Sequence, residues 1–365
     1  MINVFGNRHS NRLMKDLKDC ISSGWIGCGN HVKEFELLIS DRYKQPFVMT
    51  NNGSNAIHMA IRLLGLPKGS KIAVPSFTFV ACIHAILMEG CIPVIIDVDH
   101  HGNIKAESIK KSKSKLSAIM VVHYGGRPCD MKSLCEINLP IIEDVAHAFD
   151  SSINGEKCGT FGIFSAFSFD PIKNISTPDS GGVLLTPKTR DRAMQLRDLG
   201  ISSTGMSSKK TNRWWENEVD DVFPKYTPND IAAIFAKEQL LMLERNQKRR
   251  NKIWDIYQFE LQKIDNIVPE AEIESNTKHS FFTYLVKAKK DRDGLAQHMK
   301  NNGIYTTLRF QPLHKIKMFK KYAAEKCTMA EKLSNNGLNL PLHPRITDNE
   351  LDKIICTLKS WKPNP

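Results

Sequence analysis

The chain has 365 residues, of which 41% are hydrophobic, and carries a formal net charge of +12 at pH 7. This length and apolar content allow a large buried core and exclude an intrinsically disordered chain. No apolar run reaches the roughly 18 residues of a membrane-spanning helix, and the first 13 residues lack the apolar core of a signal peptide. We therefore expect a cytoplasmic protein that does not contact membranes.

Cysteine and histidine usage argues against a metal site. The nine cysteines include no C-x-x-C pair, which disfavours both a disulfide framework and structural zinc. The twelve histidines form no H-x-x-x-H helix motif, so we expect no metal. Basic clusters occur at residues 110–115, 248–252 and 315–321. Because no nucleic-acid-binding motif accompanies them, we interpret them as solvated helix faces whose positive field suits a diphosphate substrate rather than nucleic acid.

The N-terminal part is predicted to contain two helices and an anion site. Residues 10–45 read as a helix, a glycine-rich turn with Trp25, and a second helix; a lone tryptophan is usually packed in a core. A strand at 47–49 leads to a helix that starts near Ser54, with apolar residues three and four positions apart. The helix N–H groups, Gly53 and the Ser54 hydroxyl suit a phosphate. The alternative is that Ser54 is an ordinary N-cap.

Strands and helices then alternate. We expect strands at 71–75, 92–98 and 118–123, and a helix that opens with residues 76–79. This alternation predicts an α/β fold with a largely parallel sheet wrapped by helices.

Two strands carry the residues of greatest chemical interest. The apolar run 140–142 ends at Asp144, and a second β-rich run, 163–169, precedes Lys173. Neighbouring strands would place both side chains past the strand ends, where ligands bind in open α/β sheets. A lysine forms a Schiff base with an aldehyde cofactor, and an aspartate that faces a pyridine nitrogen keeps it protonated. Pyridoxal phosphate requires both roles.

The remainder is predicted to end in a smaller α+β unit. A helix at 190–199 precedes a polar stretch, 201–221, that reads as a mobile loop containing Trp214 and Trp215, which are either dimer contacts or walls of the substrate site. A long helix begins at 231. The C-terminal elements are a strand-like run at 281–286, a helix at 292–302, a strand at 304–309 and a helix at 349–358. We predict a large domain, residues 1–245, and a small domain, residues 246–365.

The motif spacing resembles that of a known family. The pattern Asp144-x-x-His147, Phe167-Ser168-Phe169-x-x-x-Lys173 and Gly181-Gly182 is similar to that of the DegT/StrS family of pyridoxal-phosphate-dependent nucleotide-sugar aminotransferases, and further motifs follow the family's order from about residue 22 to about residue 360. The resemblance implies a large domain like that of aspartate aminotransferase (fold type I), with a mainly parallel sheet, and a smaller C-terminal α+β domain.

The resemblance also implies roles for individual residues. Catalysis is assigned to Lys173 and Asp144. Cofactor contacts are assigned to Gly53, Ser54, Asn55, Phe79, Asp144, His147, Ser168, Lys173 and Lys225, and substrate contacts to Trp25, Arg309 and His314. Without the resemblance, several have plain alternatives: core packing for Phe79, a satisfied polar residue for His147, and solvated side chains for Lys225, Arg309 and His314.

Two positions depart from the family pattern. Asp150 stands where the family commonly has glycine, and Pro178-Asp179-Ser180 replaces a commoner Gly-Glu before the glycine pair. Neither change removes a group that the chemistry needs.

The implied reaction moves an amino group from L-glutamate to the keto sugar of a nucleoside-diphosphate sugar. Residues 24–26 resemble members that act at the 4-keto position of 6-deoxy sugars, and the product would be an amino sugar for surface polysaccharide such as the O-antigen of lipopolysaccharide. In the family, the asparagine or lysine at the position of Lys225 reaches from one subunit into the active site of the other. The resemblance therefore implies a homodimer with shared active sites. One alternative is a sugar-nucleotide dehydratase of the same family, although these typically replace the lysine by histidine. The other is a non-catalytic binding or regulatory protein.

Overall fold

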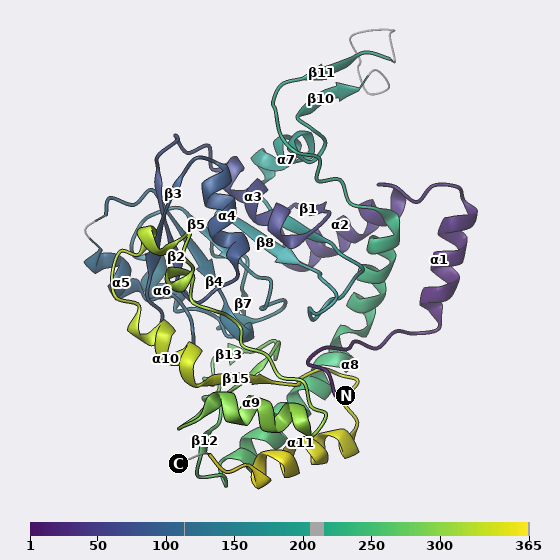
Figure 1. The fold of residues 1–365 in the computed structure, drawn as a ribbon. Coiled ribbons are helices and arrows are strands. Elements are labelled where there is room, and N and C mark those ends of the chain that lie inside the picture. Colours follow the sequence, from purple (N-terminus) through teal and green to yellow (C-terminus); the bar gives the residue numbers. More distant parts are fainter. Residues whose placement is uncertain (113, 205–214, 364–365) are drawn as a thin grey trace.

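The computed structural model describes residues 1–112, 114–204 and 215–363 (Figure 1). Its centre is a seven-stranded sheet in the order β1-β9-β8-β5-β4-β2-β3. Strand β9 is antiparallel to both of its neighbours, and the pairs from β8 to β3 are all parallel. The sheet is therefore mainly parallel, as the sequence predicts, and the carboxyl ends of its parallel strands share one edge.

The strands of this sheet are short and almost completely buried, as expected for a sheet covered on both faces. Most were predicted within one or two residues of their ends. Their bounds are β1 Phe47–Thr50, β2 Lys71–Pro75, β3 Ile92–Ile96, β4 Ala118–Val122, β5 Ile141–Asp144, β8 Phe164–Ser168 and β9 Gly181–Leu184.

Helices cover the sheet, and the N-terminal helix lies to one side of it (Figure 1). Those that alternate with the strands are α3 Gly53–Leu63, α4 Val80–Met88, α5 Ala106–Lys111, α6 Met131–Cys135 and α7 Arg190–Arg197. The predicted N-terminal pair is confirmed as α1 Arg12–Ser22 and α2 Asn30–Tyr43. Both pack against the long helix α8, Asp230–Leu261.

A second unit lies at the far end of α8 (Figure 1). It contains a three-stranded antiparallel sheet flanked by two helices: β12 Ile267–Val268, β14 Tyr284–Ala288, β15 Gly337–Leu340, α9 Arg292–Asn301 and α11 Asp348–Ser360. Its apolar cluster includes Ile2 from the N-terminus, whereas Leu313 and Leu333 belong to the cluster of the large sheet. The domain boundary at residue 245 stays a prediction. Residues from each side of this boundary pack in the apolar cluster of the other side.

The strand predicted at 304–309 is wrong. This segment makes only two isolated bridges, Ile304 with Ile2 and Thr307 with Asn339. Thr307 and Asn339 exchange two backbone hydrogen bonds, and the next one comes from a side chain: Asn339 Oδ1 accepts the N–H of Arg309 at 2.9 Å. The chain leaves the edge of β15 at this point, and residues 307–310 line a cavity instead.

The polar stretch at 201–221 is only partly a loop. Its described ends pair as an antiparallel hairpin of β10 Ile201–Thr204 and β11 Asn217–Val219, which projects from the body (Figure 1). Trp214 lies outside the described residues, and Trp215 is exposed. The remaining short elements are the β6 Ser152–Ile153, β7 Glu156–Lys157 and β13 Thr277–Lys278 sheet and the helix α10 Thr328–Asn336.

Asp150 occupies a position that suits glycine. Its φ of 64° lies in the left-handed region, which aspartate tolerates better than most residues. Its buried carboxylate forms ion pairs with Arg42 and Lys157. These pairs explain how the loop keeps its conformation without the family's glycine.

No helix in the described ranges is both long and apolar enough to cross a membrane.

Candidate active site

A cavity of about 540 Å³ opens at the carboxyl ends of the parallel strands. One side of it, here called the sheet side, is formed by residues 52–55, 144, 168 and 173. Another part of the lining, here called the outer wall, consists of residues 307–310. A cavity of this size holds a cofactor together with part of a substrate. The structure thus brings Lys173 and Asp144 into one cavity, as the sequence predicts.

Asp144 reaches the cavity because it is the last residue of β5. Successive residues of a strand face opposite sides of a sheet, and Glu143 accordingly bonds elsewhere: it pairs with His123 at 2.9 Å and accepts the N–H groups of Gly159 and Gly162. Asp144 Oδ1 accepts the Ala146 N–H at 2.9 Å. Burial raises the pKa of Asp144, and this hydrogen bond and Lys173 oppose the rise. Glu143 is structural, and Asp144 is presented to a ligand.

The anion site that the sequence predicts would lie at the N-terminus of α3. Asn52, not Ser54, is the N-cap: its side chain accepts the Asn55 N–H at 2.8 Å. The alternative reading of Ser54 as an N-cap is therefore wrong. The Ser54 side chain is exposed in the cavity and makes no hydrogen bond to any described residue. The helix dipole, unpaired N–H groups and this hydroxyl all favour an anion here.

Glycines allow the helix end to approach the sheet. A Cβ on Gly53 would lie 2.5 Å from Ser168 Cβ, and one on Gly181 would lie 2.6 Å from the Gly53 nitrogen. Larger residues at either position would push the N-terminus of α3 away from β8 and β9. This contact places the Ser168 hydroxyl beside the anion site, in agreement with the predicted phosphate contact.

Lys173 lies in the turn after β8, and its backbone carbonyl accepts a hydrogen bond from Asn7 at 2.8 Å. Its Nζ lies 4.9 Å from the centre of the Phe282 ring. Burial, followed by the positive charge of Arg309, lowers the pKa of Lys173 to about 8, against the opposing effect of Asp144. A lysine with this pKa is partly an uncharged amine near neutral pH, as a nucleophile or a proton carrier must be.

Aromatic rings frame the space between the two sides. Phe79 is 52% exposed, so the alternative of core packing is wrong, and its ring lies in the cavity, 5.7 Å from that of Phe310. His147 stacks on Phe282 at 4.0 Å and lies nearly parallel to Phe310 at 5.8 Å. Burial and the charges of Lys173 and Arg309 lower the pKa of His147 well below its usual range, so the imidazole is neutral.

Arg309 is the cation of the outer wall. Its guanidinium carbon lies 4.9 Å from the centre of the Phe282 ring, and its backbone carbonyl accepts a hydrogen bond from the Tyr124 hydroxyl. It is half-buried and lines the cavity. The alternative of a solvated strand-end arginine is therefore wrong.

Three predicted residues do not line this cavity. Trp25 is 62% exposed in the turn between α1 and α2, which also excludes the core alternative. Lys225 is exposed in the loop before α8. His314 is bonded on both ring nitrogens, to Ser76 at 2.6 Å and to Glu331 at 3.0 Å. The predicted contact of Trp25 with a substrate and that of Lys225 with a partner's site stay predictions, and the cavity gives His314 no contact with a substrate.

Several cavity residues were not singled out from the sequence. Thr78, Asp170, Asp179 and Phe310 line the cavity, and Phe282 lies behind Lys173 and Arg309. Partial burial and the nearby Asp170 raise the pKa of Asp179 to about 6. Phe282 lies more than a hundred positions after Lys173 in the sequence, and no local pattern connects the two.

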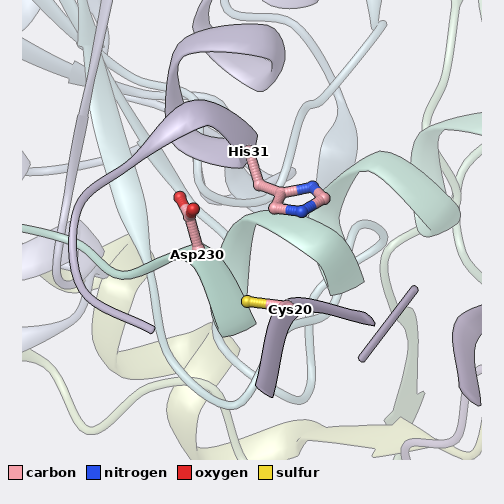
Figure 2. A group of neighbouring side chains, drawn as sticks. All are labelled: Cys20, His31 and Asp230. Atoms are coloured by element: carbon pink, nitrogen blue, oxygen red, sulfur yellow. The ribbon is translucent and has the colours of Figure 1, made fainter. Parts of the chain in front are cut away.

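A separate group of potential metal ligands lies between α1, α2 and α8: Cys20, His31 and Asp230, whose donor atoms all lie within 4.8 Å of one another (Figure 2). Asp230 Oδ1 already accepts the N–H groups of Gly29 and Val32 at 3.0 Å each. Lys237 Nζ lies 2.7 Å from His31 Nδ1, and a cation at this distance opposes a metal ion. We interpret the group as the contact that caps α2 and joins it to α8.

Comparisons with known proteins agree with this geometry. The profile of the DegT/DnrJ/EryC1/StrS aminotransferase family matches residues 7–359. The chain belongs to this family. It is 31% identical to the dTDP-4-dehydro-2,3,6-trideoxy-D-glucose 4-aminotransferase of Saccharopolyspora spinosa, over 93% of this chain and 91% of that protein. It is 30% identical to the GDP-perosamine synthase of Vibrio cholerae, over 99% of both chains.

A solved structure supports the fold assignment of this aminotransferase. The aminotransferase TlmJ of Streptoalloteichus hindustanus superposes with a TM-score of 0.91 at 30% identity, over 99% of this chain and 98% of that one. The fold is that of the type I pyridoxal-phosphate enzymes, as the sequence predicts.

The aminotransferase family depends on pyridoxal phosphate, and the cavity fits this cofactor. The α3 N-terminus, Ser54 and Ser168 offer donors for the phosphate, and the exposed Phe79 offers a flat face to the ring. Asp144 offers a buried carboxylate to a ring nitrogen, and Lys173 offers an amine for the aldehyde. The phosphate, the ring face, the ring nitrogen and the aldehyde each have a matching residue in the same cavity.

Proposed function

We propose that this aminotransferase moves an amino group from L-glutamate to the keto carbon of a nucleoside-diphosphate sugar. The observation that carries the proposal is the single cavity that combines Lys173, Asp144 and the anion site of α3. The two relatives named above act on or produce nucleotide-linked sugars, according to their names. They support a 4-keto-6-deoxy sugar as the acceptor, and we propose that the amino sugar is used for surface polysaccharide such as an O-antigen.

Each residue of the sheet side has one task in this reaction. When bound, pyridoxal phosphate supplies an aldehyde for the amino group and a protonated ring that accepts electrons from the neighbouring substrate carbon. Asp144 holds the proton at the ring nitrogen. Ser54, Ser168 and the α3 N–H groups hold the phosphate and thereby orient the ring.

Lys173 is the proton carrier. Its Nζ takes a proton from the α-carbon of the amino donor and returns one to the cofactor side, then works in the opposite order with the keto sugar. At a pKa of about 8, roughly a tenth of such amines are uncharged at pH 7. Positioned proton transfer of this kind contributes roughly 10²- to 10⁴-fold to a rate.

Arg309 faces the substrate. It is the cation that the outer wall contributes to the cavity lining, and both proposed substrates are anionic. A guanidinium binds carboxylate and phosphate oxygens through a pair of parallel hydrogen bonds. We propose that Arg309 contacts the sugar nucleotide, as the family resemblance implies.

We propose a homodimer with shared active sites. Large apolar side chains are exposed along α2, α8 and the turn before α2: Trp25 at 62%, Leu37 at 66% and Leu241 at 72%. Because α2 packs directly against α8, these side chains belong to neighbouring elements and suit an interface. Trp25 and Lys225 would then contact the partner's cavity.

The test has two stages. In the first, the visible absorption band of the bound cofactor is followed before and after L-glutamate, with Lys173→Ala as control. We expect the band to bleach in the wild type and to persist in the variant. Persistence in both would contradict the amino-donor step.

In the second stage, GDP-linked and dTDP-linked 4-keto-6-deoxy sugars are added to the glutamate-treated enzyme. We expect the band to return with one of them, together with a product whose mass shows replacement of the keto oxygen by an amine. If neither sugar restores the band, the proposed acceptor class is wrong.

A further inference from the structure

Asp144 has a second hydrogen-bond donor that the reaction described above does not use. The thiol of Cys82 on α4 lies 3.3 Å from Asp144 Oδ2. Oδ1 of the same carboxylate accepts the Ala146 N–H. Cys82 is completely buried and Asp144 is 5% exposed, so water competes little for this contact.

The thiol belongs to a short chain of hydrogen-bonding groups. Thr78 Oγ1 lies 3.6 Å from Cys82 Sγ, and Thr78 is also buried. Because an ionised Asp144 only accepts, the thiol must donate to the carboxylate, and the Thr78 hydroxyl then donates to sulfur. Thr78 immediately precedes Phe79, the N-cap of α4, and Cys82 lies in the first turn of that helix. The start of α4 therefore supports a residue at the end of β5.

We propose that Cys82 is a positioning residue for the reaction: its thiol donates a hydrogen bond to Asp144 that keeps the carboxylate ionised and oriented towards the ring nitrogen of the cofactor. The inference rests on the assigned cofactor and deepens the proposed function of Asp144. It assigns a role to a residue that neither forms a disulfide nor touches the cavity.

The physical reason lies in the balance of effects on Asp144. Burial favours the protonated carboxyl, which cannot stabilise a protonated pyridine nitrogen as an ion pair. Donors to the charged form oppose this effect, and the carboxylate has two side-chain or backbone donors among the described residues, Ala146 N–H and Cys82 S–H. Burial also raises the pKa of the Cys82 thiol well above its usual range, so the thiol keeps the proton that it donates.

Cys91 provides a matched control. It is 4% exposed and belongs to the same apolar cluster as Cys82. Its thiol makes no hydrogen bond to any residue that the structure describes. Replacement of Cys91 by alanine or serine therefore removes or changes the same atoms without affecting Asp144.

The first measurement uses infrared spectra of the full-length protein with and without pyridoxal phosphate. The difference between wild type and Cys82→Ala isolates the S–H stretch of Cys82, and the difference for Cys91→Ala isolates that of Cys91. We expect the Cys82 band at lower frequency and broadened, as for a thiol bonded to a carboxylate. Coincident bands would overturn the proposal, and this result does not depend on any substrate.

The second measurement is the affinity for pyridoxal phosphate as a function of pH. Loss of a donor raises the pKa of Asp144. The pH below which the affinity for pyridoxal phosphate falls, here called the acid limb, should therefore be higher by about one unit in Cys82→Ala than in the wild type. Cys82→Ser retains a donor and should restore the wild-type limb, and both Cys91 variants should leave it unchanged. An equal shift in Cys82→Ala and Cys91→Ala, or no rescue by serine, would show that Cys82 only packs.

Kinetics distinguish failure of this inference from failure of the proposed function. We expect Cys82→Ala to lower kcat by about tenfold with little change in the KM of L-glutamate. If the proposed amino donor or sugar acceptor is wrong, the shifted thiol band and the pH shift of cofactor affinity should still be seen. An active enzyme in which neither appears would refute the role of Cys82 alone.

Discussion

The two sides of the active-site cavity are built in different ways. On the sheet side, Asp144 and Ser168 are the last residues of their strands, and Asn52 caps the helix that follows β1. The outer wall at 307–310 comes from a segment without regular structure that lies between the two units. The register of the sheet therefore fixes the residues proposed to hold the cofactor, whereas long-range side-chain contacts fix those proposed to meet the substrate.

The contacts that hold each side differ accordingly. The sheet side depends on the close approach of the α3 backbone to β8 and β9, which the glycines at 53 and 181 allow. The outer wall depends on two hydrogen bonds: the Arg309 N–H donates to the Asn339 side chain, and the Tyr124 hydroxyl donates to the Arg309 carbonyl. Substitutions on the sheet side should thus impair cofactor chemistry, and substitutions on the outer wall should impair substrate handling.

The sharpest test of the sheet side is Asp144→Asn, which removes the negative charge and keeps the shape. We expect kcat to fall by roughly 10²- to 10³-fold, the scale of a preorganised electrostatic contact. Burial raises the pKa of Asp144 in the folded protein above its value in the unfolded chain. The folded protein therefore loses stability as the pH rises and this carboxyl group ionises. The cofactor-free variant should therefore unfold at an equal or higher temperature than the wild type at pH 8, as calorimetry can measure.

Asp179→Asn is the matched control, since Asp179 also lines the cavity and its pKa is raised, to about 6. It should retain most of the activity at pH 8. Comparable losses in the two variants would mean that the cavity needs negative charge in general, and not a carboxylate at the end of β5.

Gly53→Ala tests the approach of α3 to the sheet. Its Cβ would meet Ser168 Cβ at 2.5 Å, so the helix end must move and the phosphate donors move with it. We expect pyridoxal phosphate to bind at least tenfold more weakly, although alanine favours helices over glycine by about 1 kcal/mol. Equilibrium dialysis measures the affinity.

Ser54→Ala removes one phosphate donor without moving the helix, and its loss should be smaller than that of Gly53→Ala. The reverse order would show that the hydroxyl, and not the approach of the backbone, dominates phosphate binding.

On the outer wall, Arg309→Gln should separate substrate handling from cofactor binding. Burial is the largest cause of the lowered pKa of Lys173, about 8, and the charge of Arg309 is the next, so removal of that charge should raise the pKa part of the way towards the ordinary value near 10.5. Acylation of Lys173 in the cofactor-free enzyme, followed by mass spectrometry, should then become fast only at a higher pH than in the wild type. We also expect KM for the sugar nucleotide to rise about tenfold while cofactor affinity changes little.

Arg12→Gln removes an exposed arginine paired only with Asp16 among the described residues, and should change neither quantity. An unchanged Lys173 profile in Arg309→Gln would mean that burial alone sets the pKa of the lysine.

The same division explains what the sequence predicts and what it does not. Lys173, Asp144, Ser168 and residues 53–55 stand at fixed distances from strand and helix ends, so local patterns and motif spacing place them. Phe282 meets Lys173 only through packing of the second unit onto the first. The irregular path of 304–309 likewise depends on Asn339, thirty positions after Arg309, which no periodicity reveals.

Two alternatives to the predicted roles are excluded for local reasons. Helix α3 begins at Gly53, next to Ser54 as predicted, but the side chain that caps it is that of Asn52, so the serine hydroxyl is left for a ligand. Core packing is the usual role of a lone tryptophan or phenylalanine, but Trp25 and Phe79 are both more than half exposed. Exposed aromatic rings at such positions are a sign of function that composition alone does not give.

His314→Ala tests where the outer wall ends, and of these substitutions it should have the smallest effect on catalysis. Its ring is bonded to Ser76 and Glu331 and does not line the cavity, although Arg309 five residues earlier does. Loss of the bond to buried Ser76 should cost about 1 kcal/mol of stability, the usual net value of one hydrogen bond. KM and kcat should stay within about twofold of the wild type. A large rise in KM for the sugar nucleotide would instead extend the outer wall to residue 314 and show that substrate binding frees the imidazole from Glu331.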